Sequence, residues 1–429
     1  MPRFAGIKNN RIYVISDYPI NNKDLQTIEV PETFNHISSK DLIINSKIKD
    51  GNLIYKLRNK AAKDIKLAII TNWKMRCGIS TYAESLYPEI VKHVGSYKLF
   101  IEENIGESTS PLNQIGSEII DEDKVVVCWK RGESLQNLTE EIHRYDPDII
   151  LVNHEFGLFP DARKWLSLMN QLSEYRIIVT MHSIFHHKDK TICEAAMPEI
   201  ISHLPGGLKV LKEEKKIPGN VYVIPHGCTP CDNKEKLWNF YKSDQTFIQF
   251  GYLFSYKGYS NSIKAVSILK EKYPSVFFTG LCSESDYNKL GHQLYYNELM
   301  DLIKDLNVQE NVALIRGYQS DETLESYLRT NKVSVFPYES HPQHEVYGAS
   351  GASRLAMSKG IPVISSSVNH FSDLPTIKAD TPEEIAKALD LLFSDKKNIE
   401  LQVDKQIQFL IDNSWENVGL QHIKLFENL

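Results

Sequence analysis

No stretch of the 429-residue sequence reaches the ~18 consecutive apolar residues that a membrane-spanning helix needs. The N-terminus, MPRFAGIKNN, has no apolar core of the kind that marks a signal peptide, so we expect none there. The six cysteines show no regular spacing, which favours a reducing, cytoplasmic environment over a disulfide framework. The net charge of −6 gives no general electrostatic case for binding nucleic acid or an anionic membrane.

What the chain does have is length and an ordinary globular composition. Hydrophobic residues make up 42% of the sequence and charged residues 24%, which is typical of a folded globular protein. A chain of 429 residues is too long for one ordinary hydrophobic core, so we expect two domains.

Short apolar segments alternate with helical patterns from about residue 66 onward. This alternation predicts an α/β fold with a parallel sheet in each half. We expect strands at 67–71, 125–128, 149–152, 177–180 and 221–225, and then at 247–250, 276–279, 312–315, 333–336 and 363–365. We expect helices at about 81–91, 260–270, 352–358 and 382–393. Two Rossmann-like halves that face each other would form a deep cleft.

The most informative segment is YESHPQHEVYGASGASRLAMSKGIPVISS, from Tyr338 to Ser366. It predicts a loop of small residues, a short helix and a buried strand. The first N–H groups of a helix, together with the positive end of its dipole, favour phosphate binding. Ser350 and Gly351 would contribute such groups, and Glu345 could hold a ribose or sugar hydroxyl. We therefore expect an anionic ligand here, such as a nucleotide.

Two further loops each join a predicted strand to a predicted helix. Lys257 precedes Gly258 at the start of a helix, where it could pair with phosphate or simply lie at the surface. Gly78, in the loop RCGIST, would let a ligand approach the backbone closely, although a plain capped turn explains it equally well. Both loops follow the carboxyl end of a strand, which is where ligands bind in open α/β sheets.

Histidines follow two predicted strands of the first half. His154 and Glu155 come directly after one strand and could position a hydroxyl, transfer a proton, or form an ordinary loop hydrogen bond. His182 follows the next strand, and we expect it to point into the cleft. His186 and His187 lie nearby, but their spacing is not that of a familiar ligand set, so we expect no bound metal.

The order of these pieces resembles the retaining, nucleotide-sugar-dependent glycosyltransferases with the GT-B fold, in the large family 4 group (glycosyl transferases group 1). The resemblance runs from about Ile65 to Leu429. The matching motifs are, in order, RCGISTYAESL, VTMHS, IPHG, FGYLFSYKGYSNSIKAV, YGASGASRLAMSKGIPVISS and SWENVGLQHIKLFENL. Their shared order and spacing carry the resemblance.

The resemblance implies that a sugar moves from a nucleotide diphosphate sugar, UDP- or GDP-linked, to an acceptor hydroxyl. It also implies retention of the anomeric configuration, no cofactor and no obligatory metal. The catalytic residues would be His182, Lys257 and Glu345. The donor-binding residues would be Gly78, Arg316, Gly317, Tyr347, Ser350 and Gly351, and the acceptor-binding residues His154 and Glu155.

The same pattern divides the chain into four parts. Residues 1–65 form an N-terminal extension of unknown role. Residues 66–243 form an N-terminal Rossmann-like acceptor domain, and residues 244–410 a C-terminal Rossmann-like nucleotide-sugar donor domain. Residues 411–429 form a C-terminal helix that crosses back to the N-terminal domain.

The sequence departs from the family pattern at the donor site. Tyr252 stands where the family has a diphosphate-binding arginine, and Arg316 could supply that contact instead. The family's two glutamates correspond to Tyr347 and Leu355, and neither side chain can accept the usual hydrogen bonds. Glu345, two residues before Tyr347, could substitute through a longer loop.

No motif identifies the acceptor. We expect a glycan or another cell-surface saccharide, because that is the family's usual acceptor. The chain could instead be a viral enzyme that glycosylates a hydroxymethylated base in DNA, since some DNA-glucosylating enzymes share the GT-B fold. It could also be a non-catalytic nucleotide-sugar-binding protein or a sugar-nucleotide epimerase. The expected location is the cytoplasm of a bacterial cell or of a virus-infected host cell.

Overall fold

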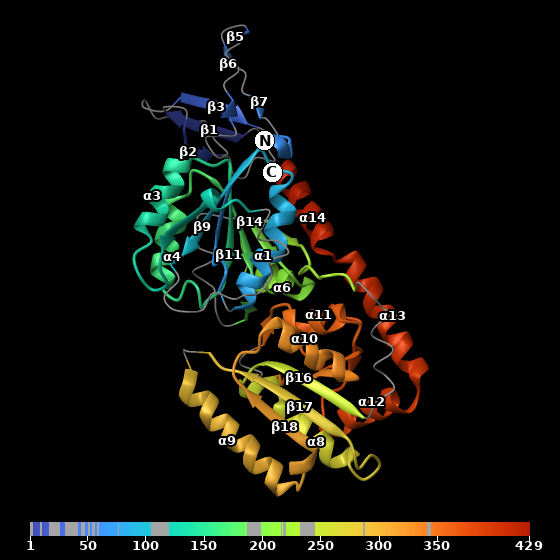
Figure 1. Cartoon of the computed structure of the whole chain (residues 1–429). Coiled ribbons are helices and arrows are strands. Elements are labelled where there is room, and N and C mark those ends of the chain that lie inside the picture. The colour runs from blue at the N-terminus through green and yellow to red at the C-terminus, as the bar shows by residue number, and fades with distance from the viewer. Residues whose placement is uncertain are drawn as a thin grey trace. The chain divides into compact units, whose positions relative to one another are not determined.

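The computed structural model describes residues 60–75, 77–103, 120–186, 199–215, 217, 220–231, 245–285, 288–340 and 345–429, and the backbone of short strands before residue 60. The chain forms two compact units (Figure 1). The first unit comprises residues 1–184, 188–224 and 419–429, and the second comprises residues 185–187 and 225–418. The chain therefore enters the second unit after Ile224, whereas the sequence pattern placed that boundary after residue 243.

Before residue 60, the described backbone forms antiparallel strands. The strands β1 (Arg3–Lys8), β2 (Arg11–Ser16) and β3 (Gln26–Val30) make a three-stranded sheet with the order β2-β1-β3. Two small ladders follow, one of β4 (Leu42–Ile43) with β7 (Lys56–Leu57) and one of β5 (Ile48–Lys49) with β6 (Asn52–Leu53).

The first unit is built on a seven-stranded sheet whose strands all run parallel. Its strands are β8 (Lys66–Thr71), β9 (Ser96–Glu102), β10 (Val125–Trp129), β11 (Ile149–His154), β12 (Arg176–Met181), β14 (Glu199–Ser202) and β15 (Val221–Val223). Their spatial order is β10-β9-β8-β11-β12-β14-β15. Every residue of the central strand β11 is buried, as a strand covered on both faces requires.

The helices of the first unit cover both faces of this sheet. They are α1 (Gly78–Val91), α3 (Gln136–Tyr145), α4 (Ala162–Gln171), α6 (Pro205–Lys209) with the π-helical turn η3 (Val210–Glu214), and the end of α14 (Trp415–Asn428). Helices α3 and α4 lie side by side on one face and α1 lies on the other (Figure 1). Right-handed crossovers produce this division. From β8 the chain moves through α1 toward the β10 edge of the sheet, and α3 then leads it in the opposite direction to β11, so the two helices lie on opposite faces.

The second unit repeats the plan with a six-stranded parallel sheet. Its strands are β16 (Thr246–Tyr252), β17 (Phe277–Ser283), β18 (Val312–Arg316), β19 (Val333–Phe336), β21 (Val363–Ser365) and β22 (Ile377–Lys378), in the order β18-β17-β16-β19-β21-β22. Its helices are α8 (Tyr259–Leu269), α9 (Lys289–Asp305), α10 (Asp321–Thr330), α11 (Gly351–Ser358), α12 (Pro382–Ser394) and α13 (Lys396–Asp412). The short strands β13 (Ile184–Phe185) and β20 (Val346–Tyr347) lie outside both parallel sheets.

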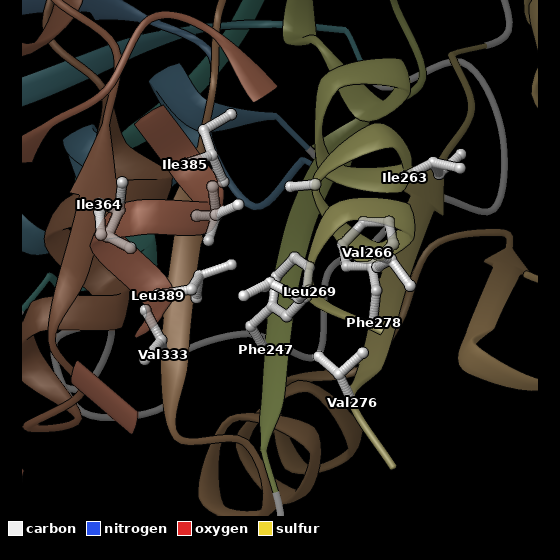
Figure 2. Close-up of a cluster of buried hydrophobic side chains, with 14 of the residues drawn as sticks. Phe247, Ile263, Val266, Leu269, Val276, Phe278, Val333, Ile364, Ile385 and Leu389 are labelled. Atoms are coloured by element: carbon white, nitrogen blue, oxygen red, sulfur yellow. The ribbon is translucent and has the colours of Figure 1, made fainter. Parts of the chain in front are cut away.

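Two hydrophobic cores lie on opposite faces of the second sheet. Phe247 of β16 packs in one core with α8, α9 and α12, and its neighbour Ile248 packs in the other with α10 and α11. Figure 2 shows the first core, where Leu269 of α8 and Leu389 of α12 meet Phe247 and Phe278. Successive strand residues point to opposite faces, so these continuous apolar strands supply both cores at once.

Each parallel sheet reverses its strand order at one place. In chain order, the first sheet reads 3-2-1-4-5-6-7 and the second reads 3-2-1-4-5-6. The reversal lies between β8 and β11 in the first unit and between β16 and β19 in the second. Ligands of open α/β sheets bind at the carboxyl ends of the strands that flank such a switch point. The strand order thus predicts that a ligand binds at the loops that follow β8, β11, β16 and β19.

The structure confirms the expected α/β class and each strand that the sequence pattern placed in the two parallel sheets. It adds β9, β14 and β22, which the pattern missed. The helix α14 lies within residues 411–429, which the pattern assigned to a C-terminal helix. Among the described residues, no helix is both long enough and apolar enough to cross a membrane.

Candidate functional site

Gly258 brings two loops of the second sheet together at its switch point. This residue follows η5 (Ser255–Lys257), ends that turn in the left-handed conformation with a φ of 70°, and begins α8. A Cβ atom at this position would lie 1.9 Å from the carbonyl oxygen of Pro337, directly after β19. Only glycine allows this approach. The loop after β16 can therefore pack against the end of β19.

Lys257 has aromatic neighbours. Its ammonium nitrogen Nζ lies 3.9 Å from the ring centroid of Tyr338 and 5.0 Å from that of Tyr256. Among the described residues, no carboxylate pairs with this ammonium. Burial lowers the pKa of Lys257, and the Tyr256 hydroxyl opposes that shift. A cation in this setting is available to an anionic ligand, because no anion in the described part of the chain neutralises it.

Tyr338 links Lys257 to the first turn of α11. The Tyr338 side chain is buried, and this burial raises its pKa while a hydrogen bond with Ser350 opposes the shift. Ser350 caps α11, since its hydroxyl accepts a hydrogen bond from the Ser353 N–H at 3.4 Å. A Cβ atom on Gly351 would meet only the Nε2 of His226, at 4.0 Å. The predicted phosphate loop therefore ends in a capped helix, although its residues 341–344 lie outside the described residues.

His370 and Asn369 join the site from a loop that the sequence pattern did not single out. They lie in the turn η8 (Asn369–Phe371), which follows β21, the neighbour of β19. The His370 ring centroid lies 5.6 Å from that of Tyr338. Burial, and then the charge of Lys257, lower the pKa of His370 to about 3, so this ring is neutral at pH 7. The rule that strand ends carry ligand contacts, applied to β21, would have found it.

Glu345 is an exposed carboxylate at the centre of a small polar group. One of its oxygens accepts hydrogen bonds from the Asn369 amide and, at 3.4 Å, from the Tyr347 hydroxyl. Its other oxygen lies 3.1 Å from the Nε2 of His186, which belongs to the second unit. The structure thus brings together Glu345 and Tyr347, two residues that the sequence placed at the donor site.

Arg316 is engaged by an acidic neighbour. Its Nε donates to Glu284 at 2.5 Å and its Nη1 donates to Gln293 at 2.9 Å, and its guanidinium lies over the ring of Tyr296. The Glu284 carboxylate raises the pKa of Arg316 further. A diphosphate would have to compete with Glu284 for this charge. Gly317, next to it, takes a φ of 97° and has open space where a Cβ would lie.

Arg354 and Leu355 sit on α11 in contrasting surroundings. Arg354 is only 2% exposed; its Nη1 donates to the Ser350 carbonyl at 3.0 Å and its Nη2 pairs with Asp373. Leu355 is 36% exposed. The buried Arg354 therefore stabilises the start of α11 through the Ser350 carbonyl. Leu355, an apolar residue, is exposed at the position where the family pattern has a carboxylate.

In the first unit, Gly78 lies in open space at the start of α1. Among the described residues beyond its own helix and its chain neighbours, no atom lies within 4 Å of the position that a Cβ would occupy. The preceding loop is held by buried polar groups, since Ser80 accepts from the Met75 N–H at 2.9 Å and donates to Glu84 at 2.7 Å. Packing does not require glycine at position 78, so the space beside it is open to a ligand. Arg76 of the same motif lies outside the described residues.

His182 follows β12 and bonds to a buried amide. Its Nε2 lies 3.2 Å from the Oδ1 of Asn153, and its ring stands edge-on to Tyr82 with the centroids 4.7 Å apart. Burial first, and then His203 and His154, lower the pKa of His182 well below its usual value. This histidine is therefore a neutral imidazole at pH 7.

His154 lies in the core of the first unit. Its ring is 1% exposed and stacks on Phe159, with Phe156 and Trp165 edge-on to it. Burial lowers its pKa to about 3. This placement does not support the predicted contact between His154 and an acceptor, because the ring is enclosed by aromatic side chains. At this strand end Glu155 is the accessible side chain, and it accepts a hydrogen bond from Ser183 at 2.7 Å.

Metal ligands do not gather in the described parts of the chain. Within those residues, no three His, Cys, Asp or Glu side chains are arranged to hold a metal ion. Within the described residues, Cys228 and Cys231 form no disulfide. His187, which follows His182 and His186 in the sequence, lies outside the described residues.

Comparison with known proteins assigns the second unit to a family. Residues 232–408 match the family described as glycosyl transferases group 1. No protein of curated function matches the sequence. Residues 232–408 are less than half of the chain, so the match gives the second unit a glycosyl transferases group 1 domain, and the fold of the two units is of the GT-B type.

Several solved structures share the fold across both units at low sequence identity. Anabaena HepE in complex with UDP-glucose aligns with a TM-score of 0.61 and 12% identity, over 85% of this chain and 100% of that one. A glycosyltransferase from Rickettsia africae aligns with a TM-score of 0.63 and 13% identity, over 85% and 98%. A trehalose-phosphate synthase from Burkholderia xenovorans, in complex with glucose-6-phosphate, aligns with a TM-score of 0.62 and 12% identity, over 84% and 100%.

Proposed function

We propose that the protein transfers a sugar from a nucleoside diphosphate sugar, with UDP as the favoured nucleotide, to an acceptor hydroxyl with retention of the anomeric configuration. The observation that carries this proposal is Lys257, a cation at the switch point with no carboxylate partner among the described residues. Tyr338 connects it to the first turn of α11. The HepE complexes with UDP and UDP-glucose support UDP as the donor nucleotide.

Cleavage of the donor's glycosidic bond leaves negative charge on the diphosphate. A site that speeds this step must place fixed positive charge where the negative charge grows. Lys257 would supply a full positive charge. The N–H groups of Ser350 and Gly351, at the start of α11, would add the partial positive charge of a helix N-terminus. We assign no such role to Arg316, because Glu284 already holds its guanidinium. These groups would take the place of a divalent metal.

Other groups would hold the sugar and the acceptor. Glu345 would accept hydrogen bonds from sugar hydroxyls, and Tyr347 and Asn369 would hold its carboxylate in place. Gly78 and His182 of the first unit would contact the donor. Glu155 would lie on the acceptor side, where we propose a glycan or another cell-surface saccharide. We also propose a cytoplasmic location, which fits the five cysteines of the described residues, since these form no disulfide with one another.

The Lys257→Ala variant tests the proposal, with Lys264→Ala as the matched control on the exposed face of α8. Each variant is incubated with a panel of UDP- and GDP-sugars and saccharide acceptors, and the nucleoside diphosphate and the glycosylated product are measured. Loss of Lys257 should lower kcat by about 10²–10³-fold, the usual effect of removing one group that stabilises a transition-state charge. The control should keep wild-type turnover. Wild-type turnover in both variants would refute the assignment of Lys257.

The same assay separates the competing functions. A donor sugar that changes configuration without an acceptor would identify an epimerase. A donor that binds but is never consumed would identify a binding protein. Product formed only on DNA with hydroxymethylated bases would identify a DNA-modifying enzyme.

A further inference from the structure

The Asn153 side chain, on β11, contacts residues from both neighbouring strands, β8 and β12. It lies on β11, is fully buried, and reaches β8 on one side and the end of β12 on the other. Its amide nitrogen Nδ2 lies 3.0 Å from the Oγ1 of Thr71, the last residue of β8. Its amide oxygen Oδ1 lies 3.2 Å from the Nε2 of His182. Both ends of this amide therefore have partners.

The hydroxyl of Thr71 determines which way the amide faces. Thr71 donates its own proton to the carbonyl oxygen of Asn72 at 3.0 Å, and a carbonyl oxygen can only accept. Thr71 Oγ1 can then only accept from Asn153, so the amide N–H group must face Thr71. The amide oxygen is left to face His182.

An amide oxygen cannot donate a hydrogen bond, so the proton between Asn153 and His182 must belong to the imidazole. We infer that Asn153 is a positioning residue that holds His182 in its Nε2–H tautomer, leaving the Nδ1 lone pair to accept a hydrogen bond from a hydroxyl of the donor sugar. This inference rests on the proposed glycosyl transfer and deepens it. It assigns His182 to the sugar, because a lone pair that accepts would be repelled by the oxygens of a diphosphate.

The surroundings of His182 keep the imidazole neutral. Tyr82 of α1 stands edge-on to the ring, and His203 after β14 lies with its centroid 5.2 Å away. His154 of β11 adds a further unfavourable interaction with an imidazolium. The Glu155 carboxylate, which follows β11, bonds to the Ser183 hydroxyl at 2.7 Å. The groups that face His182 thus disfavour the charged form, which would lose its acceptor.

Nitrogen NMR of the full-length protein labelled with ¹⁵N-histidine tests the inference without any donor. A His182→Gln variant assigns the His182 signals by their disappearance. We expect a neutral imidazole with protonated Nε2 and unprotonated Nδ1 across about pH 5–8. Asn153→Ala should release the tautomer, so that both neutral forms are observed. An Nδ1–H tautomer in the wild type, or an unchanged tautomer in Asn153→Ala, would overturn the inference.

The pH dependence of kcat/KM in an Asn153→Asp variant gives a second test, because loss of packing alone would not change that dependence. A carboxylate beside Nε2 stabilises the imidazolium and raises the pKa of His182. In the variant, kcat/KM should fall about tenfold per pH unit below that raised pKa, while the wild type stays flat there. Asn170→Asp, on the exposed face of α4, adds the same charge and should keep the wild-type profile. A flat profile in Asn153→Asp would count against the positioning role.

The two measurements also separate this inference from the proposed function. If no donor is consumed by the wild type, the proposed transfer fails, whereas the NMR result on the tautomer stands by itself. If transfer is observed and the tautomer is wrong, only the role of Asn153 fails.

Discussion

His154 and His182 lie at the carboxyl ends of neighbouring strands, yet their surroundings give them different properties. His154 is enclosed by Phe156, Phe159 and Trp165, so its ring serves as one more aromatic side chain of the core. His182 instead bonds to Asn153. The residue type alone did not separate these two roles, since both positions follow an apolar strand.

The buried ring of His154 should make the fold sensitive to acid. Its pKa is about 3 in the folded protein and 6.5 when unperturbed, so the unfolded chain binds more protons between these values. Stability should therefore fall as the pH drops below 6.5, by about 2 kcal/mol at pH 5 from this group. His154→Phe fits the aromatic cage and should lose the part of the acid sensitivity that His154 contributes, while the buried His182 and His370 keep theirs. Urea unfolding at pH 8 and pH 5 measures the difference.

The control for this measurement is His93→Gln, because His93 is exposed at the end of α1. That variant should keep the acid sensitivity of the wild type. If His154→Phe keeps it as well, the His154 ring does not titrate as its burial requires. If His154→Phe folds normally but loses transfer, the predicted contact with the acceptor gains support.

At the scale of elements, Arg354 joins a helix to a loop. Its guanidinium bonds to the Ser350 carbonyl at the start of α11 and pairs with Asp373, which follows the turn that carries Asn369 and His370. Arg354 therefore joins two elements of the candidate site, the start of α11 and the turn η8. Lys378 supports the same turn, since its ammonium donates to the Phe371 carbonyl at 2.7 Å.

Removal of this buried charge should destabilise the second unit strongly. Arg354→Met leaves Asp373 without its partner, and breaking a buried ion pair costs about 3–5 kcal/mol. Arg329→Met on α10 removes an arginine whose pair with Glu325 is exposed, and should cost less than about 1 kcal/mol. Denaturant unfolding of both variants compares the two costs. Similar losses in the two variants would show that the Arg354–Asp373 pair contributes no more than a surface pair.

In the whole molecule, the chain passes from one unit to the other beside two segments that backbone hydrogen bonds join, one around Cys228 and one around Trp415. Within the second unit, Cys228 N–H donates to the Asn413 carbonyl at 2.8 Å, and Trp415 N–H donates to the Cys228 carbonyl at 3.2 Å. Gly227 packs so closely on the Trp415 ring that a Cβ would lie 2.0 Å from it. These contacts lie beside the two points, after Ile224 and after Val418, where the chain changes unit.

A ligand that binds only the folded chain should raise its melting temperature. At a hundredfold excess over Kd, the added stability is about 2.7 kcal/mol. We expect UDP and a UDP-sugar to raise the Tm, and we expect the shift to persist in EDTA because Lys257 and the N–H groups of α11 would supply the positive charge. Thermal shift with a nucleotide panel, with and without EDTA, measures both effects. A shift lost in EDTA would indicate a metal-dependent site, and a shift with GDP alone would change the assigned nucleotide.

The strands and the order of the motifs were readable from the sequence because they are local properties. A central parallel strand buries both faces and so reads as an unbroken apolar run, as in β11. The strand β9 was missed because its first residue is exposed and the next two are only half-buried, which breaks that run. The start of α11 was predicted within one residue, since a capping serine before glycine is a local signal.

Local patterns in the amino-acid sequence were enough to predict the α/β class, the positions of the main strands and the two loops, at Lys257 and at Ser350, that the proposed donor site uses. The fold, in contrast, sets the environment of each predicted group, because that environment depends on contacts between side chains. It paired Arg316 with Glu284, enclosed His154 in aromatic rings, and brought His370 to Tyr338 and Lys257. The approach of His370 to Tyr338 and Lys257 depends on the strand order that places β19 between β16 and β21. His370 lies tens of residues from Tyr338 and Lys257 in the chain, so no local pattern encodes their contact.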